Sequence, residues 1–367
     1  MGRVKKVIFT VTNDLVTDQR MQRICGAFHR RGYDVVLVGR RLENSEPVDH
    51  LPYKTKRLVC AFNKGKLFYL EFNIRLFFYL LFSHSDLLWA VDCDTAVPAR
   101  FVSLIKRIPW VFDAHELFTM VPEVINRKRV QAVWEKVQAM AFKRSAMAFT
   151  VGSALADWFG QQYGTKVHVL KNAPPLEMSL PYEPDEDKFI LYQGALNEGR
   201  GLECLIRAME QIHCKLLIAG EGDLSHFLRQ MVTKLGLAEK VVFLGRIQPA
   251  ALPALTRRAW IGYNVSEPKG LSYELSLNNK FFDYLHAGLP SLINPFSEYV
   301  KLNSQFQVGL LTNPSIPSIV ENANLLLMDA VLHKQLADNC KLAATLWNWE
   351  SEEAHLFTIF ESRFPDA

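Results

Sequence analysis

Residues 7–38, VIFTVTNDLVTDQRMQRICGAFHRRGYDVVLV, contain the pattern that decides the fold. The apolar runs 7–11 and 34–38 predict two buried strands. Between them, apolar residues recur at helical spacing: Met21, Ile24, Cys25 and Phe28. Gly32 ends this helix, because glycine readily takes the left-handed backbone that follows a helix. A strand, a helix and a second strand in this order predict two parallel neighbours in a sheet covered by helices.

The same alternation continues along most of the chain. Further strands are predicted at 87–91, 110–113, 148–151, 167–170, 189–192, 215–219, 241–244, 260–263 and 291–293. Residues 172–187, NAPPLEMSLPYEPDED, are rich in proline and acidic residues and have no period, so we place a domain boundary there. The predicted fold class is α/β, with two doubly wound, Rossmann-like domains facing across a cleft. We expect the first domain over residues 1–172 and the second over 173–345.

Composition narrows the function classes. The chain has 367 residues, 49% of them hydrophobic and 22% charged, which is enough apolar material for two cores. A net charge of +4 is mild, so no nucleic-acid partner is expected. The apolar run after Lys5 and Lys6 is too short for a signal peptide. The six cysteines form no CxxC pair and are typical of reduced thiols in the cytoplasm.

Residues 270–293, GLSYELSLNNKFFDYLHAGLPSLI, carry the most informative chemistry. A polar loop opens a helix there, and it contains Ser276, Asn278 and Asn279. Backbone N–H groups at a helix start attract phosphate, and Lys280 adds a positive charge. Asp283, nearly one turn on, can accept hydrogen bonds from two ribose hydroxyls. A capped helix with a solvated Asp283 is the competing interpretation, and the loop alone does not decide between them.

Glycine-containing strand ends in the second half are candidates for the rest of a nucleotide site. Residues 194–209, GALNEGRGLECLIRAM, start with Gly194 and reach Arg200 at a helix start, where a guanidinium suits a diphosphate. The segments AGEGDL and FLGRI supply Gly220, Gly222, Gly245 and Arg246. An exposed arginine near a tight turn, and ordinary turns at the other glycines, are the alternatives.

The first half offers polar groups at the ends of its own strands. VFDAHE, residues 111–116, places His115 where a neutral imidazole can bond a sugar hydroxyl or support charge at the reaction centre. A histidine satisfied by local backbone is the alternative. Candidates for acceptor or sugar contacts are Asn13, Asp14 and Glu116. We interpret Asp92-Cys93-Asp94 as a turn and helix cap, and no cluster has convincing metal spacing, so no metal is expected.

Residues 66–82, KLFYLEFNIRLFFYLLF, are rich in Phe and Leu but contain Glu71, Asn73 and Arg75. They fall short of the roughly 20 apolar residues that a spanning helix needs. One interpretation is a core helix of the first domain. The other is a helix resting on an anionic membrane, with a lipid-linked envelope glycan as acceptor. Basic residues near it are Lys54, Lys56, Arg57 and Lys64.

Together these segments resemble the GT4-type retaining glycosyltransferases of the GT-B fold, the glycosyl transferases group 1. The likeness runs along nearly the whole chain, through TDQRMQRICGAFHRRGYDVVLV, VFDAHELF, QGALNEGRGLECLIRAM, AGEGD, FLGRI and NKFFDYLHAGLPSL. It implies that Arg200 and Lys280 hold the diphosphate of a nucleotide-sugar donor and that Asp283 binds its ribose. It also implies that His115 lies beside the transferred sugar. A helix around 349–364, within a terminal segment 346–367, would cross back onto the N-terminal domain.

The resemblance further implies a metal-independent transfer with retention, and no cofactor besides the donor substrate. The chain departs from the family at the phosphate-and-sugar loop. The family usually has two Glu separated by seven residues, whereas here the second is Asp283 and the first falls at Leu275. Glu274 is out of register by one and is kept as a candidate sugar contact. Ala195 stands where the family often has Arg. Altered donor choice, a sugar-nucleotide 2-epimerase and a non-catalytic nucleotide-sugar-binding protein are the alternatives.

Overall fold

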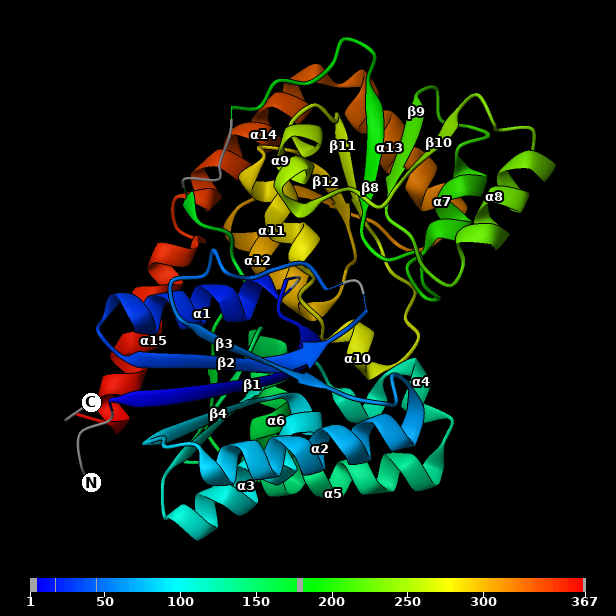
Figure 1. Ribbon diagram of the computed structural model, residues 1–367. Coiled ribbons are helices and arrows are strands. Elements are labelled where there is room, and N and C mark those ends of the chain that lie inside the picture. Colours follow the sequence, from blue (N-terminus) through cyan, green and yellow to red (C-terminus); the bar gives the residue numbers. More distant parts are fainter. Residues whose placement is uncertain (1–4, 17, 44, 177–180, 366–367) are drawn as a thin grey trace. The chain divides into compact units, whose positions relative to one another are not determined.

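The computed structural model describes residues 5–16, 18–43, 45–176 and 181–365. The chain divides into two compact units, each with its own sheet (Figure 1). The first unit contains residues 1–171 and 353–367, and the second contains residues 172–352. The end of the chain therefore belongs to the same unit as its beginning.

The first unit is built on a seven-stranded sheet in the order β3-β2-β1-β4-β5-β6-β7, with every neighbouring pair parallel. The strands are β1 (Lys6–Asp14), β2 (Asp34–Arg41), β3 (Lys54–Val59), β4 (Leu87–Val91), β5 (Trp110–Ala114), β6 (Met147–Thr150) and β7 (Val167–Val169). The order reverses between β1 and β4. In such sheets ligands bind beyond the carboxyl ends of the strands, at this reversal.

Helices cover both faces of this sheet. They are α1 (Gln19–Arg30), α2 (Gly65–Phe82), α3 (Asp92–Lys106), η1 (Phe118–Met120), α4 (Pro122–Ile125), α5 (Lys128–Arg144), α6 (Ser153–Tyr163) and the end of α15 (Trp349–Arg363). Figure 1 shows α2, α3 and α5 side by side on one face. On the other face, the ring of Phe28 in α1 lies 5.0 Å from that of Phe357 and 4.9 Å from that of Phe360. The predicted apolar face of α1 is confirmed, since all four of its residues are buried.

The second unit repeats the plan with a six-stranded parallel sheet in the order β10-β9-β8-β11-β12-β13. Its strands are β8 (Phe189–Gln193), β9 (Lys215–Ala219), β10 (Val241–Gly245), β11 (Ile261–Asn264), β12 (Ser291–Ile293) and β13 (Gly309–Leu311). The order reverses between β8 and β11, so the ends of these two strands define the expected ligand position.

The helices of the second unit pack around a core centred on β8, β9 and β11. They are α7 (Leu202–Ala208), α8 (Ser225–Lys234), η3 (Pro249–Ala251), α9 (Leu252–Thr256), α10 (Leu271–Glu274), α11 (Asn279–His286), α12 (Ser297–Gln305), α13 (Ile316–Met328) and α14 (Ala330–Ala344). Gly201, just before α7, has φ +67°, and a Cβ there would lie 2.4 Å from the carbonyl oxygen of Val265. The turn into α7 therefore requires glycine.

Helix α2 has two apolar stripes with different surroundings. One is buried against the first unit and consists of Phe68, Phe72, Leu76 and Leu80. The other is exposed and consists of Leu67, Leu70, Ile74, Phe78 and Phe82. Phe101, Leu104 and Ile105 of the neighbouring α3 are also exposed. Within the described residues, no helix combines the length and apolar character needed to cross a membrane.

Candidate functional site

The carboxyl ends of β8, β9 and β10 meet at three of the predicted glycines. The Gly194 N–H donates to the Ala219 carbonyl at 3.0 Å, and the Gly220 N–H donates to the Gly245 carbonyl at 2.8 Å. A Cβ on Gly220 would lie 1.9 Å from the Gly194 carbonyl oxygen, so no side chain fits there. A Cβ on Gly194 would lie 3.6 Å from the Lys280 Nζ. The bare backbone of the β8 end thus lies directly beside the predicted phosphate-binding lysine.

Lys280 and Arg200 are two cations whose charged groups lie against tyrosine rings. The Lys280 ammonium lies 4.1 Å from the ring centroid of Tyr192, and the Arg200 guanidinium lies 5.2 Å from that of Tyr273. In the part of the chain that the structure describes, neither forms an ion pair. Burial and the nearby charge of Arg200 lower the pKa of Lys280 well below its ordinary value, although Asp283 opposes this. An anion placed between the two cations would relieve their repulsion.

The start of α11 supplies backbone donors. Asn278 is its N-cap residue, but the side chain makes no capping bond and donates instead to the Asn264 Oδ1 at 3.3 Å. Asn279 accepts from the Asn172 amide at 2.7 Å, and the Ser276 hydroxyl donates to the Tyr273 carbonyl at 2.8 Å. These three polar side chains hold the loop in place. The first N–H groups of the eight-residue helix have no side-chain cap, which favours an anion there.

Asp283 faces the end of β8. Its carboxylate accepts from the Gln193 Nε2 at 3.1 Å, and the Gln193 Oε1 accepts from the Thr256 hydroxyl at 2.8 Å. Asp283 is only partly exposed, which disfavours the solvated alternative. Sequence reasoning missed Gln193 and Tyr192. The available signal was a polar residue that ends an otherwise apolar strand immediately before Gly194.

The remaining predicted donor contacts lie around the same strand ends. The Gly222 N–H donates to the Ser225 hydroxyl at 2.8 Å, and a Cβ on Gly222 would lie 2.4 Å from the Asn197 Oδ1. Gly245, the last residue of β10, has φ +69°. Arg246 is exposed and, with the stronger contact from Arg229, lowers the pKa of the Glu221 carboxyl to about 2. Glu274 is exposed at the end of α10.

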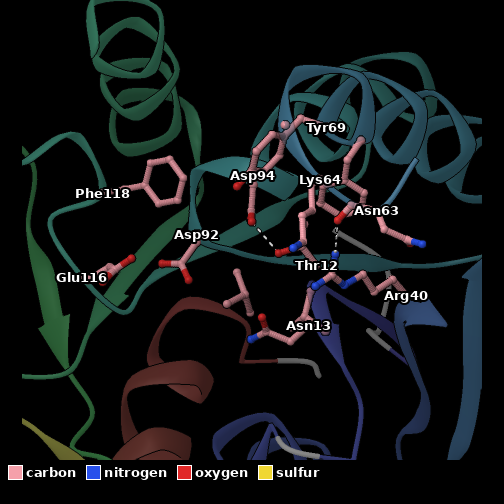
Figure 2. A pocket seen from close by; sticks show the side chains of 14 residues that line it. Thr12, Asn13, Arg40, Asn63, Lys64, Tyr69, Asp92, Asp94, Glu116 and Phe118 are labelled. Atoms are coloured by element: carbon pink, nitrogen blue, oxygen red, sulfur yellow. Dashed lines mark hydrogen bonds between the residues drawn. The ribbon is translucent and has the colours of Figure 1, made fainter. Parts of the chain in front are cut away.

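In the first unit a pocket of about 460 Å³ opens at the carboxyl ends of β1 and β4 (Figure 2). It is lined by Val11, Thr12, Asn13, Arg40, Asn63, Lys64, Gly65, Phe68, Tyr69, Val91, Asp92, Asp94, Glu116 and Phe118. The predicted candidates Asn13 and Glu116 are among these. Asp14 is not, because it forms an ion pair with Arg57 at 3.2 Å and accepts from the Ser45 hydroxyl.

His115 lies between two carboxylates. Its Nε2 is 3.3 Å from the Asp113 Oδ2, and its Nδ1 is 3.8 Å from the Asp92 Oδ2. Burial by itself would lower the pKa of His115, but Asp113 and Asp92 raise it to about 9. The two carboxylates thus favour the cationic imidazole, whereas the neutral form was considered from the sequence; the role of His115 beside a sugar stays a prediction. Asp113 in turn binds Arg20 through two bonds of 2.9 and 3.2 Å.

Asp92 and Asp94 differ from the predicted helix cap. They do lie in the first turn of α3, but Val91 is the N-cap residue and makes no side-chain cap. Asp92 accepts from the His115 backbone N–H at 2.8 Å and has φ +54°, which is unusual for a residue other than glycine. Asp94 accepts from the Thr12 hydroxyl at 2.5 Å. Both carboxylates line the pocket, so their role extends beyond the local turn.

Family comparisons match almost the whole chain in two adjoining segments. Residues 19–177 match the model of Glycosyltransferase Family 4, and residues 181–343 match that of Glycosyl transferases group 1. The chain belongs to the GT4-type family of group 1 glycosyltransferases. The sequence resemblance is thereby confirmed.

Individual relatives agree with this family. An uncharacterized glycosyltransferase of Methanocaldococcus jannaschii, MJ1607, is 30% identical over 164 residues, which are 43% of this chain and 40% of that protein. The match therefore spans less than half of this curated relative. Sucrose-phosphate synthase from Thermosynechococcus elongatus superposes with a TM-score of 0.82 at 15% identity, covering 99% of this chain and 100% of that one. Anabaena HepE in complex with UDP and glucose superposes with a TM-score of 0.80 at 16% identity, covering 98% and 100%. At these identities the structures show the fold alone, and the predicted GT-B class is confirmed.

Proposed function

We propose that this chain transfers a glycosyl group from a nucleotide-diphosphate sugar to an acceptor hydroxyl, with retention and without a metal. The observation that carries the proposal is a pair of neighbouring cations, Arg200 and Lys280, which form no ion pair among the described residues. Lys280 lies beside the bare backbone of Gly194. An anion with two phosphates matches two cations and the uncapped start of α11. HepE, which shares the fold, was crystallised with UDP and glucose. This supports a nucleotide-sugar donor here.

The proposed transfer depends on stabilising the negative charge of the leaving diphosphate. When the bond from the sugar to the diphosphate breaks, negative charge develops on the leaving phosphate. Arg200, Lys280 and the backbone N–H groups of α11 would stabilise that charge as fixed positive groups at the proposed diphosphate site. Asp283, fixed by Gln193, accepts hydrogen bonds from the ribose and orients the donor.

The exposed apolar stripe of α2 supports an acceptor at a membrane surface. Phe82 is 81% exposed and Leu70 is 59% exposed, which is unusual for side chains of this size. Lys66 and Arg75 lie on the same helix and favour anionic lipids. We therefore assign the reaction to cell-envelope polysaccharide or glycolipid synthesis at the inner face of the cytoplasmic membrane, with a lipid-linked glycan as acceptor.

A thermal-shift screen tests the donor site. We expect one of UDP, GDP, ADP or dTDP, or a sugar ester of one of them, to raise the melting temperature of the wild type. Arg200→Ala and Lys280→Ala should fold normally and lose this shift. Lys334→Ala removes an exposed lysine of α14 and serves as the charge-matched control. If no nucleotide shifts the wild type, or the variants respond like it, the donor site is elsewhere.

A turnover assay separates the transferase from its alternatives. The nucleotide-sugar found in the screen is incubated with the enzyme, with and without a membrane glycolipid extract. Release of nucleoside diphosphate with formation of a glycosylated lipid supports the transferase. Conversion of the donor alone into its epimer identifies an epimerase, and binding without either reaction identifies a non-catalytic protein.

A further inference from the structure

We propose that the pocket of the first unit binds its acceptor as a glycosyl phosphate, with the sugar ring against Asp92 and Asp94 and the phosphate against Arg40 and Lys64. This inference rests on the proposed function, because it names the acceptor of that reaction. Four features of the pocket carry it: its carboxylates, its cations, its aromatic rings and its position beside α2.

Three carboxylates, those of Asp92, Asp94 and Glu116, line the pocket. Figure 2 shows Asp92 and Glu116 on the opposite side of the opening from Arg40 and Asn63. Burial, with repulsion from Asp94 and Glu116, raises the pKa of Asp92 to about 7. Burial, with repulsion from Glu116, raises the pKa of Asp94 to about 6. Hydroxyl donors from a sugar stabilise the ionised forms of such carboxylates, and each carboxylate has room for more than one donor. A neutral ring with adjacent hydroxyls therefore fits this side.

The cations form the other side. The Arg40 guanidinium lies 4.7 Å from the ring centroid of Phe68, and its Nη1 donates to the Asn63 carbonyl at 3.4 Å. Its Nε is buried and makes no hydrogen bond within the described residues. Lys64 is exposed at the N-cap of the 18-residue helix α2, which has no side-chain cap. Arg40, Lys64 and the positive end of α2 together favour a phosphate.

Two aromatic rings complete the lining. Tyr69 and Phe118 both pack against Trp134, with ring centroids 5.6 and 4.9 Å apart. Trp134 thus fixes their orientation, and they give the pocket an apolar surface for the C–H face of a sugar. The volume of about 460 Å³ lies within the range of small-molecule sites, about 300–1,000 Å³. In the described part of the chain no three His, Cys, Asp or Glu side chains are grouped to hold a metal ion.

The pocket also lies at the start of the exposed apolar stripe. Gly65 lines the pocket and is the first residue of α2, and Leu67 and Leu70 follow on the exposed stripe. A phosphate held at Arg40 and Lys64 therefore has an apolar surface next to it. The same glycosyl phosphate can come from a lipid or from a soluble sugar phosphate, and the experiment separates these sources.

Ligand-observed NMR titrations test the pocket with paired probes. The probes are the 1-phosphates of glucose, galactose and N-acetylglucosamine, each beside its methyl glycoside. We expect at least one 1-phosphate to bind the wild type about tenfold more tightly than its glycoside, as hydrogen bonds to a charged group require. Asp92→Asn should weaken both members of that pair about tenfold, whereas Arg40→Gln should weaken only the phosphate.

The variants are chosen so that the fold is kept. Asparagine tolerates the left-handed backbone of Asp92 and can still accept from the His115 N–H. Asp34→Asn makes the same chemical change at the exposed start of β2 and should leave both probes unaffected. Lys280→Ala should also leave them unaffected, because it removes the anion site of the second unit. Melting temperatures confirm that each variant is folded.

Several outcomes overturn the inference. It fails if no 1-phosphate binds, if Asp92→Asn binds like the wild type, or if Arg40→Gln weakens both probes alike. It also fails if Lys280→Ala abolishes binding, since the phosphate then occupies the donor site. Sugar phosphate binding without any nucleotide thermal shift would support the binding site in this pocket and contradict the proposed function. A nucleotide thermal shift without sugar phosphate binding would support the donor site and contradict this inference.

A second arm identifies the source of the phosphate. It compares the sugar 1-phosphate that binds in the titrations, free in solution, with the same group esterified to a polyprenol in phosphatidylcholine vesicles, using the donor from the thermal-shift screen. Faster transfer to the vesicle-bound form, lowered by Ile74→Ser, supports a lipid-linked acceptor. Equal transfer to both forms, unchanged by Ile74→Ser, supports a soluble glycosyl phosphate. Transfer to neither form overturns the inference.

Discussion

The two units share a strand order, but Arg20 of the first unit and the cations Arg200 and Lys280 of the second have different partners. In the first unit, Arg20 is 4% exposed and forms two bonds with Asp113, which is fully buried. In the second unit, Arg200 and Lys280 lie against tyrosine rings and form no ion pair among the described residues. The shared topology determines where polar groups gather. The partners of those groups determine whether the charge serves folding or is kept for a ligand.

The largest effect should come from breaking the paired cation. Arg20→Met leaves the Asp113 carboxylate buried beside His115 alone and also removes a donor to the Leu170 carbonyl. Removing one member of a buried pair typically costs about 3–5 kcal/mol. We expect this loss in the urea unfolding of the first unit, followed by tryptophan fluorescence. Lys280→Met breaks no ion pair among the described residues and removes a desolvated cation that Arg200 repels, so it should be neutral or stabilising. Equal losses in both variants would contradict the comparison.

Substitution of Lys280, which should not lower stability, should have a large effect on turnover. Lys280→Met should lower turnover about 10²–10³-fold, because a donor oriented toward developing charge is lost. Release of nucleoside diphosphate measures this, and Lys334→Met is the control on an exposed helix. Wild-type turnover in Lys280→Met would show that the lysine is a passive part of the loop.

The contrast between the units was only partly visible in the sequence. The apolar runs predicted the buried strands because both faces of a parallel sheet are covered. They did not predict β3, whose sequence KTKRLV is charged, because an edge strand has fewer buried positions. Because β3 was not predicted, the ion pair between Asp14 and Arg57 of β3 could not be predicted either. β13, with only three residues, also gave no signal.

Site residues were predictable where the chemistry is local. Lys280 and Asp283 share one helix, so their spacing placed them together. Asp92 and His115 are 23 residues apart and meet only because β4 and β5 are neighbours in the sheet. A local pattern could therefore suggest a helix cap but not the bond to the His115 backbone. The raised pKa of His115 depends on the same long-range contact.

The exposed stripe of α2 gives a test confined to the first unit. Ile74→Ser should lower binding to phosphatidylglycerol-containing vesicles about tenfold, since an apolar side chain leaves the lipid boundary. Co-sedimentation at low and high salt measures this, and salt should weaken the wild type by screening Lys66 and Arg75. Leu244→Ser, at an exposed position in the second unit, is the matched control. No binding of the wild type at low salt would remove the membrane proposal.

The smallest effect concerns the charge of His115, which faces Asp113 of β5, Asp92 of α3 and Arg20 of α1. Its pKa is raised from 6.5 to about 9, so the stabilisation it gives is complete below pH 6.5 and is lost as pH rises through 9. Asp92→Asn removes one of the two carboxylates that raise this pKa, so the pKa should fall while Asp113 keeps it above its ordinary value. An NMR titration of the imidazole, assigned with His115→Gln, measures the change. An unchanged pKa would mean that Asp113 alone raises the pKa of His115 and that Asp92 has no effect on it.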